Sequence, residues 1–214
     1  MRRTRIKICG LTRAEDAAAA VAAGADALGV VLAPSKRRVS LEQAAAVLAT
    51  APPLVARIGV FVDASPGFIG EAVARLGLTA VQFHGDETPE DCAAAPVPVI
   101  KALRVGPGFD AASVDRYRTT VAALLLDTYV PGGERGGTGV AFDWYDVAGR
   151  LPDWAPVLLA GGLEPGTVGN AVRTLRPFAV DVSSGVESAP GLKDHGLIDS
   201  FCAAVHAADR EVLG

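Results

Sequence analysis

The sequence predicts an α/β fold, a single (β/α)8 barrel of parallel strands that spans residues 1–214. Short apolar runs rich in β-branched residues alternate with Ala-rich amphipathic stretches. The apolar runs are nearly continuous, as strands covered on both faces require. Eight even units fit the length of a barrel, and no linker or change of composition divides the chain. An open doubly wound sheet is the alternative, but it leaves the glycines after both of the last two strands unexplained.

The elements follow in order along the chain. Strands are expected near residues 5–9, 27–32, 55–62, 79–83, 97–103, 122–126, 156–160 and 178–182. Helices are expected near residues 13–23, 41–51, 66–76, 89–95, 110–119, 142–150, 165–175 and 192–209. Four helices have start signals: capping boxes at Thr12 with Glu15 and at Ser40 with Gln43, and a first-turn proline at Pro89 and at Pro165.

The composition excludes several classes of protein. Twenty basic and 24 acidic side chains give a net charge of −4, which argues against a nucleic-acid partner. The three cysteines are widely spaced, so we expect neither a disulfide framework nor a metal site. Neither a signal peptide nor a membrane span is evident. We therefore expect a cytoplasmic protein without a membrane partner.

In a (β/α)8 barrel the active site lies at the C-terminal ends of the strands, and polar residues and glycines gather there in this sequence. The last two loops predict a site for one phosphate monoester, built from Gly161, Gly162, Ser183, Ser184 and Gly185. Glycines let backbone N–H groups approach an anion, and the serine turn can open a short helix. The alternative is that these residues only form tight turns.

Cys9 and Asp127 stand at the ends of the first and sixth strands, on opposite sides of the predicted mouth. Two groups placed in this way could act on two faces of a small substrate as general base and general acid. A lone cysteine is often a small core residue, and Asp127 could instead cap the next loop. A depressed pKa would make Cys9 sensitive to alkylation. Lys7 has the same strand parity as Cys9, and whether both face inward is left open.

Two further residues have alternative interpretations. Arg37 belongs to a basic run that is either solvated or supplies a bidentate clamp for a carboxylate. His84 is either a hydrogen-bonded rim histidine or a substrate contact.

Ten motifs occur in order over nearly the whole chain: KICGLT (7–12), SKRRVS (35–40), GVFV (59–62), VQFHGDE (81–87), LDT (126–128), GGTG (136–139), FDW (142–144), AGGL (160–163), VDVSSGVE (180–187) and PGLKD (190–194). Together they resemble the phosphoribosylanthranilate isomerase family of tryptophan biosynthesis. The family fold is a (β/α)8 barrel, in agreement with the pattern above.

The resemblance implies an Amadori rearrangement of N-(5-phosphoribosyl)anthranilate to the aminoketose, without a cofactor. It implies Cys9 as general base and Asp127 as general acid. It also implies that Arg37 holds the anthranilate carboxylate and that Asp181 contacts sugar hydroxyls. It implies phosphate contacts at Gly161, Gly162 and the 183–185 turn, and closure of Gly137, Thr138 and Gly139 over the substrate. Gln82 and His84 are further candidate substrate contacts, because they stand at the end of the fourth strand. The expected partner is a phosphosugar, and the expected state is a monomer, with a homodimer as the alternative.

Two rival functions remain open from the sequence. The related isomerase of histidine biosynthesis, or a bifunctional enzyme, would need a second phosphate site and typically an aspartate as base. Here Cys9 holds that position, and the third and fourth strands lack a second Gly-Gly pair. A non-catalytic phosphate-binding barrel would keep the last two loops but would need neither Cys9 nor Asp127.

Overall fold

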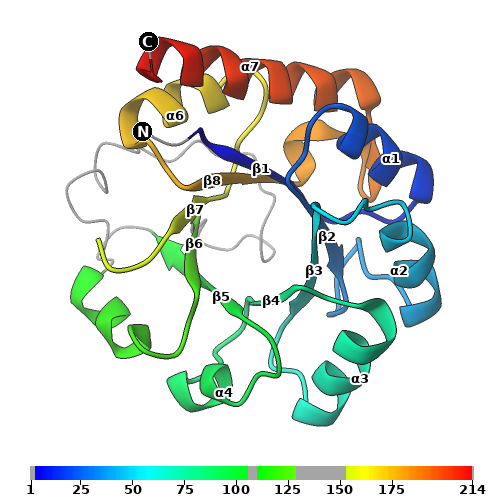
Figure 1. The fold of residues 1–214 in the computed structure, drawn as a ribbon, viewed down its shortest axis with the longest axis vertical. Coiled ribbons are helices and arrows are strands. Elements are labelled where there is room, and N and C mark those ends of the chain that lie inside the picture. Colours follow the sequence, from blue (N-terminus) through cyan, green and yellow to red (C-terminus); the bar gives the residue numbers. More distant parts are fainter. Residues whose placement is uncertain (1–2, 106–109, 129–152, 214) are drawn as a thin grey trace.

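A computed structural model describes residues 3–105, 110–128 and 153–213 of the chain. Eight parallel strands form a closed barrel in which each strand pairs with the next and the last pairs with the first. The strands are β1 (Arg5–Ile8), β2 (Ala27–Val31), β3 (Ala56–Phe61), β4 (Ala80–Phe83), β5 (Val99–Val105), β6 (Ala123–Thr128), β7 (Val157–Leu159) and β8 (Ala179–Val182). Figure 1 shows the ring of strands with helices outside it. The predicted barrel is confirmed.

The helices that cover the barrel are α1 (Ala14–Ala22), α2 (Leu41–Leu48), α3 (Pro66–Leu76), α4 (Pro89–Ala93), α6 (Val168–Leu175) and α7 (His195–Leu213). A 3-10 helix, η1 (Ala111–Tyr117), stands where the sequence predicts the helix at 110–119. The helix predicted at 142–150 lies outside the described residues. Among the helices that are described, none is long and apolar enough to cross a membrane.

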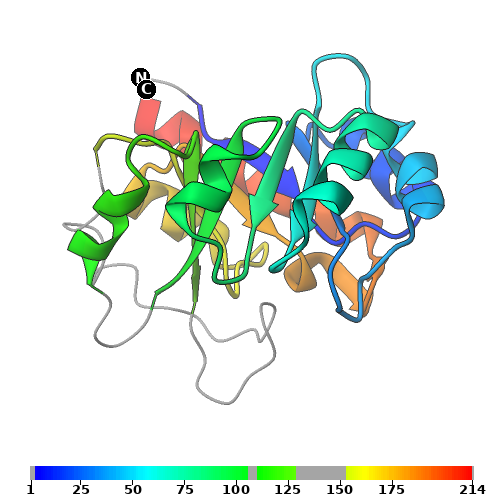
Figure 2. The ribbon, with the colours of Figure 1, turned by 90° about the horizontal axis from the view of Figure 1, so that it is seen from below.

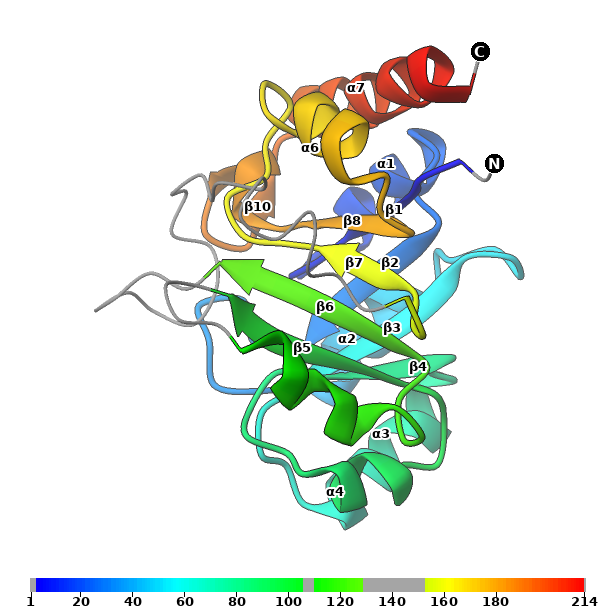
Figure 3. The same cartoon turned by 90° about the vertical axis from the view of Figure 1, so that its left-hand side faces the viewer.

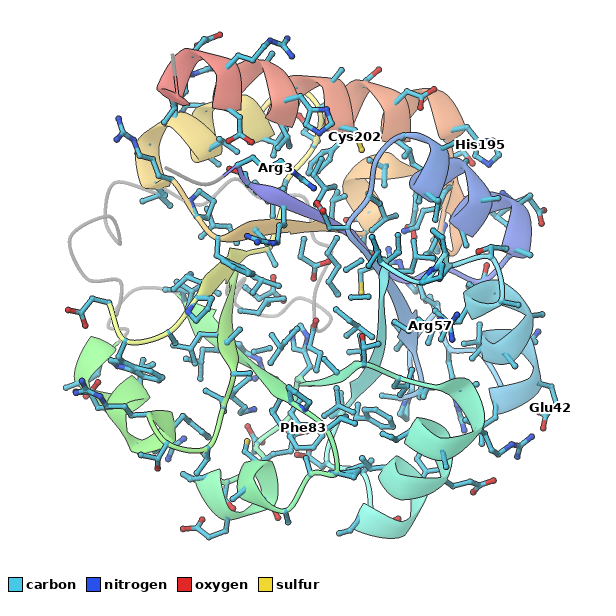
Figure 4. The ribbon with its side chains drawn as sticks, in the orientation of Figure 1. Arg3, Glu42, Arg57, Phe83, His195 and Cys202 are labelled. Atoms are coloured by element: carbon cyan, nitrogen blue, oxygen red, sulfur yellow. The ribbon has the colours of Figure 1, made fainter. Side chains whose placement is uncertain are left out.

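Alternating residues of each strand point to two different cores. One set fills the barrel interior and consists of Ile58, Ile100, Ala102, Ala123, Leu125, Leu158, Ala160 and Ala179. The other set lies between the strands and the helices. There Phe83 meets the edge of Phe61 with ring centroids 6.5 Å apart, and Figure 4 places Phe83 outside the ring of strands. Both faces of every strand are therefore buried, which explains the continuous apolar runs.

Two of the predicted helix starts are confirmed. The Ser40 hydroxyl accepts from the Gln43 amide, and the Gln43 side chain accepts from the Ser40 amide. Thr88 forms the same reciprocal arrangement with Asp91, and Pro89 occupies the first turn. In both cases a side chain satisfies an N–H group that the first turn leaves without a partner.

The other two predicted starts are wrong. α1 begins after Arg13, which makes no side-chain cap, because the Thr12 hydroxyl donates instead to the carbonyl of Gly191. α6 begins at Val168, so Pro165 lies in the preceding turn. A contact from a distant part of the chain decides the first case, and local sequence alone could not reveal it.

A short hairpin follows β8 and was not predicted. Its strands are β9 (Glu187–Ala189) and β10 (Leu192–Lys193), so the last helix begins at His195 and not at residue 192. Before the hairpin, η2 (Ser184–Val186) forms one turn of 3-10 helix. Figures 2 and 3 show that this orange segment lies beside the C-terminal ends of the strands, whereas both chain termini lie toward the opposite face. The hairpin therefore belongs to the mouth of the barrel.

The last helix is fastened to the first strand by buried hydrogen bonds. The Asp209 carboxylate accepts from the Thr4 backbone N–H at 2.8 Å and from the Thr4 hydroxyl at 2.7 Å. The substitution Asp209→Asn should lower the free energy of unfolding by about 1–3 kcal/mol, because it weakens charge-assisted bonds at a buried site.

Urea denaturation of the purified protein measures this loss. Glu211→Gln is the matched control on the same helix, because its 3.2 Å pair with Arg173 is exposed. The control should change stability by less than about 1 kcal/mol. Equal stability of Asp209→Asn and the wild type would show that this fastening contributes nothing.

Candidate active site

A cavity of about 380 Å³ opens at the C-terminal mouth of the barrel. It brings together most of the residues that the sequence singles out: Cys9, Arg37, Gln82, His84, Asp127, Gly161, Gly162, Asp181, Ser183 and Ser184. These residues come from six of the strands or the loops that follow them. The barrel therefore collects side chains that are far apart in the chain around one space of substrate size.

One predicted residue, Gly185, lies outside this lining, and three others fall in the part of the chain that the structure does not describe. Gly137, Thr138 and Gly139 lie outside the described residues. Among the described residues Gly185 does not line the cavity, and it packs behind it instead. A Cβ atom at Gly185 would collide with the carbonyl oxygen of Leu163. Gly185 thus allows the loops after β7 and β8 to pack against each other.

Cys9 directly follows β1, and its backbone N–H donates to the carbonyl of Val182 at 2.8 Å. The side chain is buried, and this burial raises the pKa of the thiol above its ordinary value. The positive charge of Lys7 lowers that pKa, and the charge of Asp181 raises it further. The sequence made a depressed pKa conditional on groups that favour the thiolate, and in the structure the net shift is upward. Burial, which the sequence does not show, is the reason.

Lys7 points into the barrel, on the same face of β1 as Cys9. Its ammonium donates to Asp181 at 2.8 Å across the β1–β8 seam, where the two residues are paired in register. Burial is the largest single influence and opposes the charged form of Lys7, but Asp181 and Cys9 together outweigh it and raise the lysine pKa. The only sequence feature that indicated this inward position was that Lys7 and Cys9 are two residues apart and so lie on the same face of the strand.

Asp127 ends β6 as an inward-facing residue and is almost fully buried. Its Oδ2 lies 3.1 Å from His84 Nε2, and His84 Nδ1 lies 3.1 Å from Gln82 Nε2. The Gln82 amide can donate only from its nitrogen, so in this arrangement Nδ1 accepts and Nε2–H donates to the Asp127 carboxylate. His84 is thus a hydrogen-bonded rim histidine that also lines the cavity, and its contact with substrate stays a prediction.

Arg37 is held by a carboxylate from the hairpin. Its Nε and Nη2 groups donate to the two oxygens of Glu187 at 2.8 and 2.7 Å. Glu187 also accepts from Lys193 at 2.8 Å. Burial would raise the pKa of Glu187, but Arg37 and Lys193 together lower it. Arg37 is therefore not a solvated side chain of a basic run.

Sequence reasoning missed Glu187 and Lys193 as members of the site. Both stand within motifs that were recognised, but Glu187 pairs with Arg37, which is 150 residues away along the chain. Gly10 explains the close approach of these loops. Its φ of +70° suits glycine, and a Cβ atom there would lie 2.6 Å from Arg37 Cδ and 2.7 Å from Ser183 Oγ.

The loop after β7 contains two consecutive glycines in the left-handed backbone region. Gly161 and Gly162 have φ values of +84° and +66°, a region that other residues rarely adopt. They line the cavity together with Ser183 and Ser184. Lys193 holds the second loop by donating to the Ser183 carbonyl at 2.9 Å. Two glycines and two serines therefore converge on one part of the cavity.

Comparison with known proteins gives consistent findings. Residues 6–204 match the family model of N-(5'phosphoribosyl)anthranilate isomerase. The chain is 51% identical over 209 residues to N-(5'-phosphoribosyl)anthranilate isomerase of Pseudomonas putida, covering 97% of this chain and 100% of that one. The crystal structure of phosphoribosyl anthranilate isomerase from Thermotoga maritima superimposes with a TM-score of 0.86 at 41% identity, covering 95% and 99% of the two chains.

A further crystal structure is similar and contains a bound ligand. It is a phosphoribosyl anthranilate isomerase in complex with reduced 1-(o-carboxyphenylamino)-1-deoxyribulose 5-phosphate. Its TM-score is 0.83 at 40% identity, covering 95% of this chain and 99% of that one.

The raised pKa of Cys9 predicts slow alkylation. At about pH 7 the thiol should react with iodoacetamide more slowly than free cysteine, whose pKa is about 8.5, because the thiolate is the reactive form. As the pH rises the labelling of Cys9 should accelerate. Peptide mass spectrometry of the folded protein measures each cysteine separately.

Cys92 and Cys202 are the internal controls. Burial raises the pKa of each to about 11, and neither lines the cavity. Because Cys9 lines the cavity and the other two do not, the reagent reaches Cys9 first, and Cys9 should label before both. Labelling of Cys9 at its maximal rate already at about pH 7 would contradict the raised pKa.

Proposed function

The chain belongs to the N-(5'-phosphoribosyl)anthranilate isomerase family, and we propose that Cys9 and Asp127 are the general base and general acid of its reaction. The reaction is the Amadori rearrangement of N-(5-phosphoribosyl)anthranilate to 1-(2-carboxyphenylamino)-1-deoxyribulose 5-phosphate in tryptophan biosynthesis. One observation carries the assignment of roles. Cys9 and Asp127 reach the same cavity from strands on different sides of the ring, so a substrate between them meets one group on each side.

The rearrangement needs two proton transfers by the protein. Asp127 gives its proton to the ring oxygen of the ribose, the C1–O bond breaks, and a cationic Schiff base forms at C1. Cys9, as thiolate, then takes the proton from C2, and the electron pair of that C–H bond forms the C1–C2 double bond of an enolamine. Tautomerisation of the enolamine gives the ketone. The cationic Schiff base acidifies the C2 proton and also favours the thiolate.

His84 and Gln82 support the acid. For Asp127 to donate to the substrate, its carboxyl must carry a proton. That proton can lie on Oδ1, which leaves Oδ2 to accept from His84 Nε2–H. Gln82 Nε2 donates to His84 Nδ1 and so fixes this tautomer, while Gln82 Oε1 is buried and has no partner among the described residues.

The phosphate of the substrate fits the two final loops. Gly161 and Gly162 offer backbone N–H groups, and Ser183 and Ser184 add hydroxyls and the first turn of η2. Gly185 keeps the loops in contact. The complexed relative described above holds a ligand that is itself a 5-phosphate, which supports a phosphosugar as substrate.

Arg37 is proposed to bind the anthranilate carboxylate. Glu187 uses two of the five N–H groups of the guanidinium and fixes its plane at the cavity wall. A fixed guanidinium loses little conformational freedom when the substrate carboxylate binds. Asp181, held by Lys7, is proposed to accept from the sugar hydroxyls, and closure by residues 137–139 stays a prediction.

The remaining expectations are part of the same proposal. Residues 1–214 form one domain that works as a monomer in the cytoplasm, and no cofactor, nucleic acid or membrane takes part. Within the described ranges, no group of three His, Cys, Asp or Glu side chains is arranged to hold a metal ion.

The decay of anthranilate fluorescence tests the function. With N-(5-phosphoribosyl)anthranilate generated in situ, the purified protein should remove the fluorescence of the substrate. No decay would contradict the isomerase function, and the histidine-pathway substrate would then be tested.

Replacing either proton-transfer group should lower kcat more than it changes KM. Cys9→Ser should reduce kcat about a hundredfold to ten-thousandfold, because a hydroxyl is a far weaker base, and Asp127→Asn should act similarly. Cys202→Ser is the control, since Cys202 is a buried residue of α7 and does not line the cavity. Wild-type kcat in Cys9→Ser or Asp127→Asn would remove that residue from the mechanism.

Glu187→Gln should raise KM about tenfold, equivalent to about 1.4 kcal/mol of binding, because Arg37 loses its ionic anchor. The matched control is Glu42→Gln, which interrupts an exposed pair with Arg75 on the outside of the barrel. Figure 4 shows Glu42 at the periphery. Steady-state kinetics measures both variants, and an unchanged KM in Glu187→Gln would argue against anchoring of Arg37.

A further inference from the structure

Lys7 is a buried cation directly beneath the base. Its side chain is 1% exposed, and it does not line the cavity. A Cβ atom at Gly29 on β2 would lie 2.8 Å from Cys9 Sγ and 3.2 Å from Lys7 Cε. The ends of both side chains therefore converge on the space that the missing side chain of Gly29 leaves. The Lys7 ammonium is bonded to Asp181, and the Gly29 gap brings the end of its side chain beside the Cys9 thiol.

The buried lysine on the other side of the barrel is different. Lys101 is 2% exposed and also lies 2.8 Å from a carboxylate, that of Glu87. It donates in addition to the carbonyls of Gly85 and Phe83, so backbone groups complete its coordination. Lys101 faces outward from β5 and holds the loop after β4. Beside its carboxylate partner, Lys101 contacts backbone carbonyl oxygens. Beside its own carboxylate partner, Lys7 instead lies next to the Cys9 thiol.

The charged groups around Cys9 favour an anion there. Lys7, Lys193 and Arg37 are cationic, and Asp181 and Glu187 are anionic. The five groups thus have one positive charge in excess when Cys9 is a thiol. A thiolate would neutralise that excess. Lys7 and Lys193 lower the pKa of the thiol, against burial and Asp181, which raise it.

We propose that Lys7 is a positioning residue for the general base: its ammonium, held in place by Asp181, stabilises the Cys9 thiolate that removes the C2 proton. This rests on the proposed role of Cys9. Ionisation of the thiol releases its proton to water in the cavity, because the Lys7 ammonium cannot accept it. The thiolate then becomes a thiol again by taking the C2 proton. Lys7 stays charged throughout, which explains a buried ion pair that is otherwise costly inside an apolar barrel.

The pH dependence of Cys9 alkylation and of kcat/KM tests the proposal. In Lys7→Met both profiles should move to higher pH by about one to three units, the effect of an opposite charge at short range. The alkylation profile is the primary readout, because it does not depend on the sugar contact proposed for Asp181, which Lys7 also holds. Lys101→Met is the matched control, with an equally buried lysine that loses an equally short ion pair. Its profiles should coincide with those of the wild type.

A second variant covers the case in which Lys7→Met leaves Asp181 unpaired and does not fold. Lys7→Met/Asp181→Asn removes both charges. Its alkylation profile should still lie at higher pH than that of the wild type, because Lys7 acts on the thiol more strongly than Asp181 does. Circular dichroism establishes that each variant is folded. A wild-type alkylation profile in a folded Lys7→Met or double variant overturns the proposal.

The two readouts separate this proposal from the proposed function. If alkylation shifts but kcat/KM does not, Lys7 does act on the thiol and Cys9 is not the base. If Cys9→Ser is inactive and neither profile moves in Lys7→Met, Cys9 is the base and Lys7 does not support it.

Discussion

The ion pair between Lys7 and Asp181 joins the first and last strands where the barrel closes. Both side chains lie in the barrel interior, so neither can be left without the other except at a cost of about 3–5 kcal/mol. The next inward positions on the same two strands are Cys9 and Ser183, and the Cys9 N–H donates to the carbonyl of Val182. The base and the phosphate loop are therefore positioned by the same seam.

The other functional side chains reach the cavity because they occupy inward-facing positions of their strands. Gln82 and His84 reach the cavity from β4 and its following loop, and Asp127 reaches it from β6. Their hydrogen-bonded chain spans strands that are not neighbours in the barrel. The hairpin β9–β10 adds a second network in which Glu187 holds Arg37. Each functional group is thus fixed by a partner from another strand or loop, as a preorganised site requires.

The fold was predictable because two properties of the sequence, its apolar runs and their even spacing, are enough to identify it. Apolar runs identify strands buried on both faces, and their even spacing identifies the barrel. Cys9 and Asp127 were predictable as strand-end residues. The Thr12 cap was mispredicted because Gly191, far along the chain, takes its hydroxyl. The pairing of Arg37 with Glu187 could not be predicted either, because it depends on how loops that are far apart in the sequence contact each other.

The protonation of Cys9 was also beyond the sequence. The sequence around a cysteine at a strand end does not distinguish a solvated thiol from an enclosed one. Only the structure shows that the Cys9 thiol is enclosed. Enclosure raises the thiol pKa, and the neighbouring cation lowers it. The balance between them depends on distances inside the barrel, among them the space above Gly29. Residue type and position predict the candidate base, whereas its electrostatics follow from packing.

The most direct test is a single-turnover measurement of anthranilate-fluorescence decay with substrate that carries deuterium at C2 of the ribose. If Cys9 removes that proton, decay in the wild type should be slower with deuterium than with hydrogen. Cys9→Ser should show no decay on the same timescale. Equal decay of the two substrates in the wild type, together with equally fast decay in Cys9→Ser, would contradict the account.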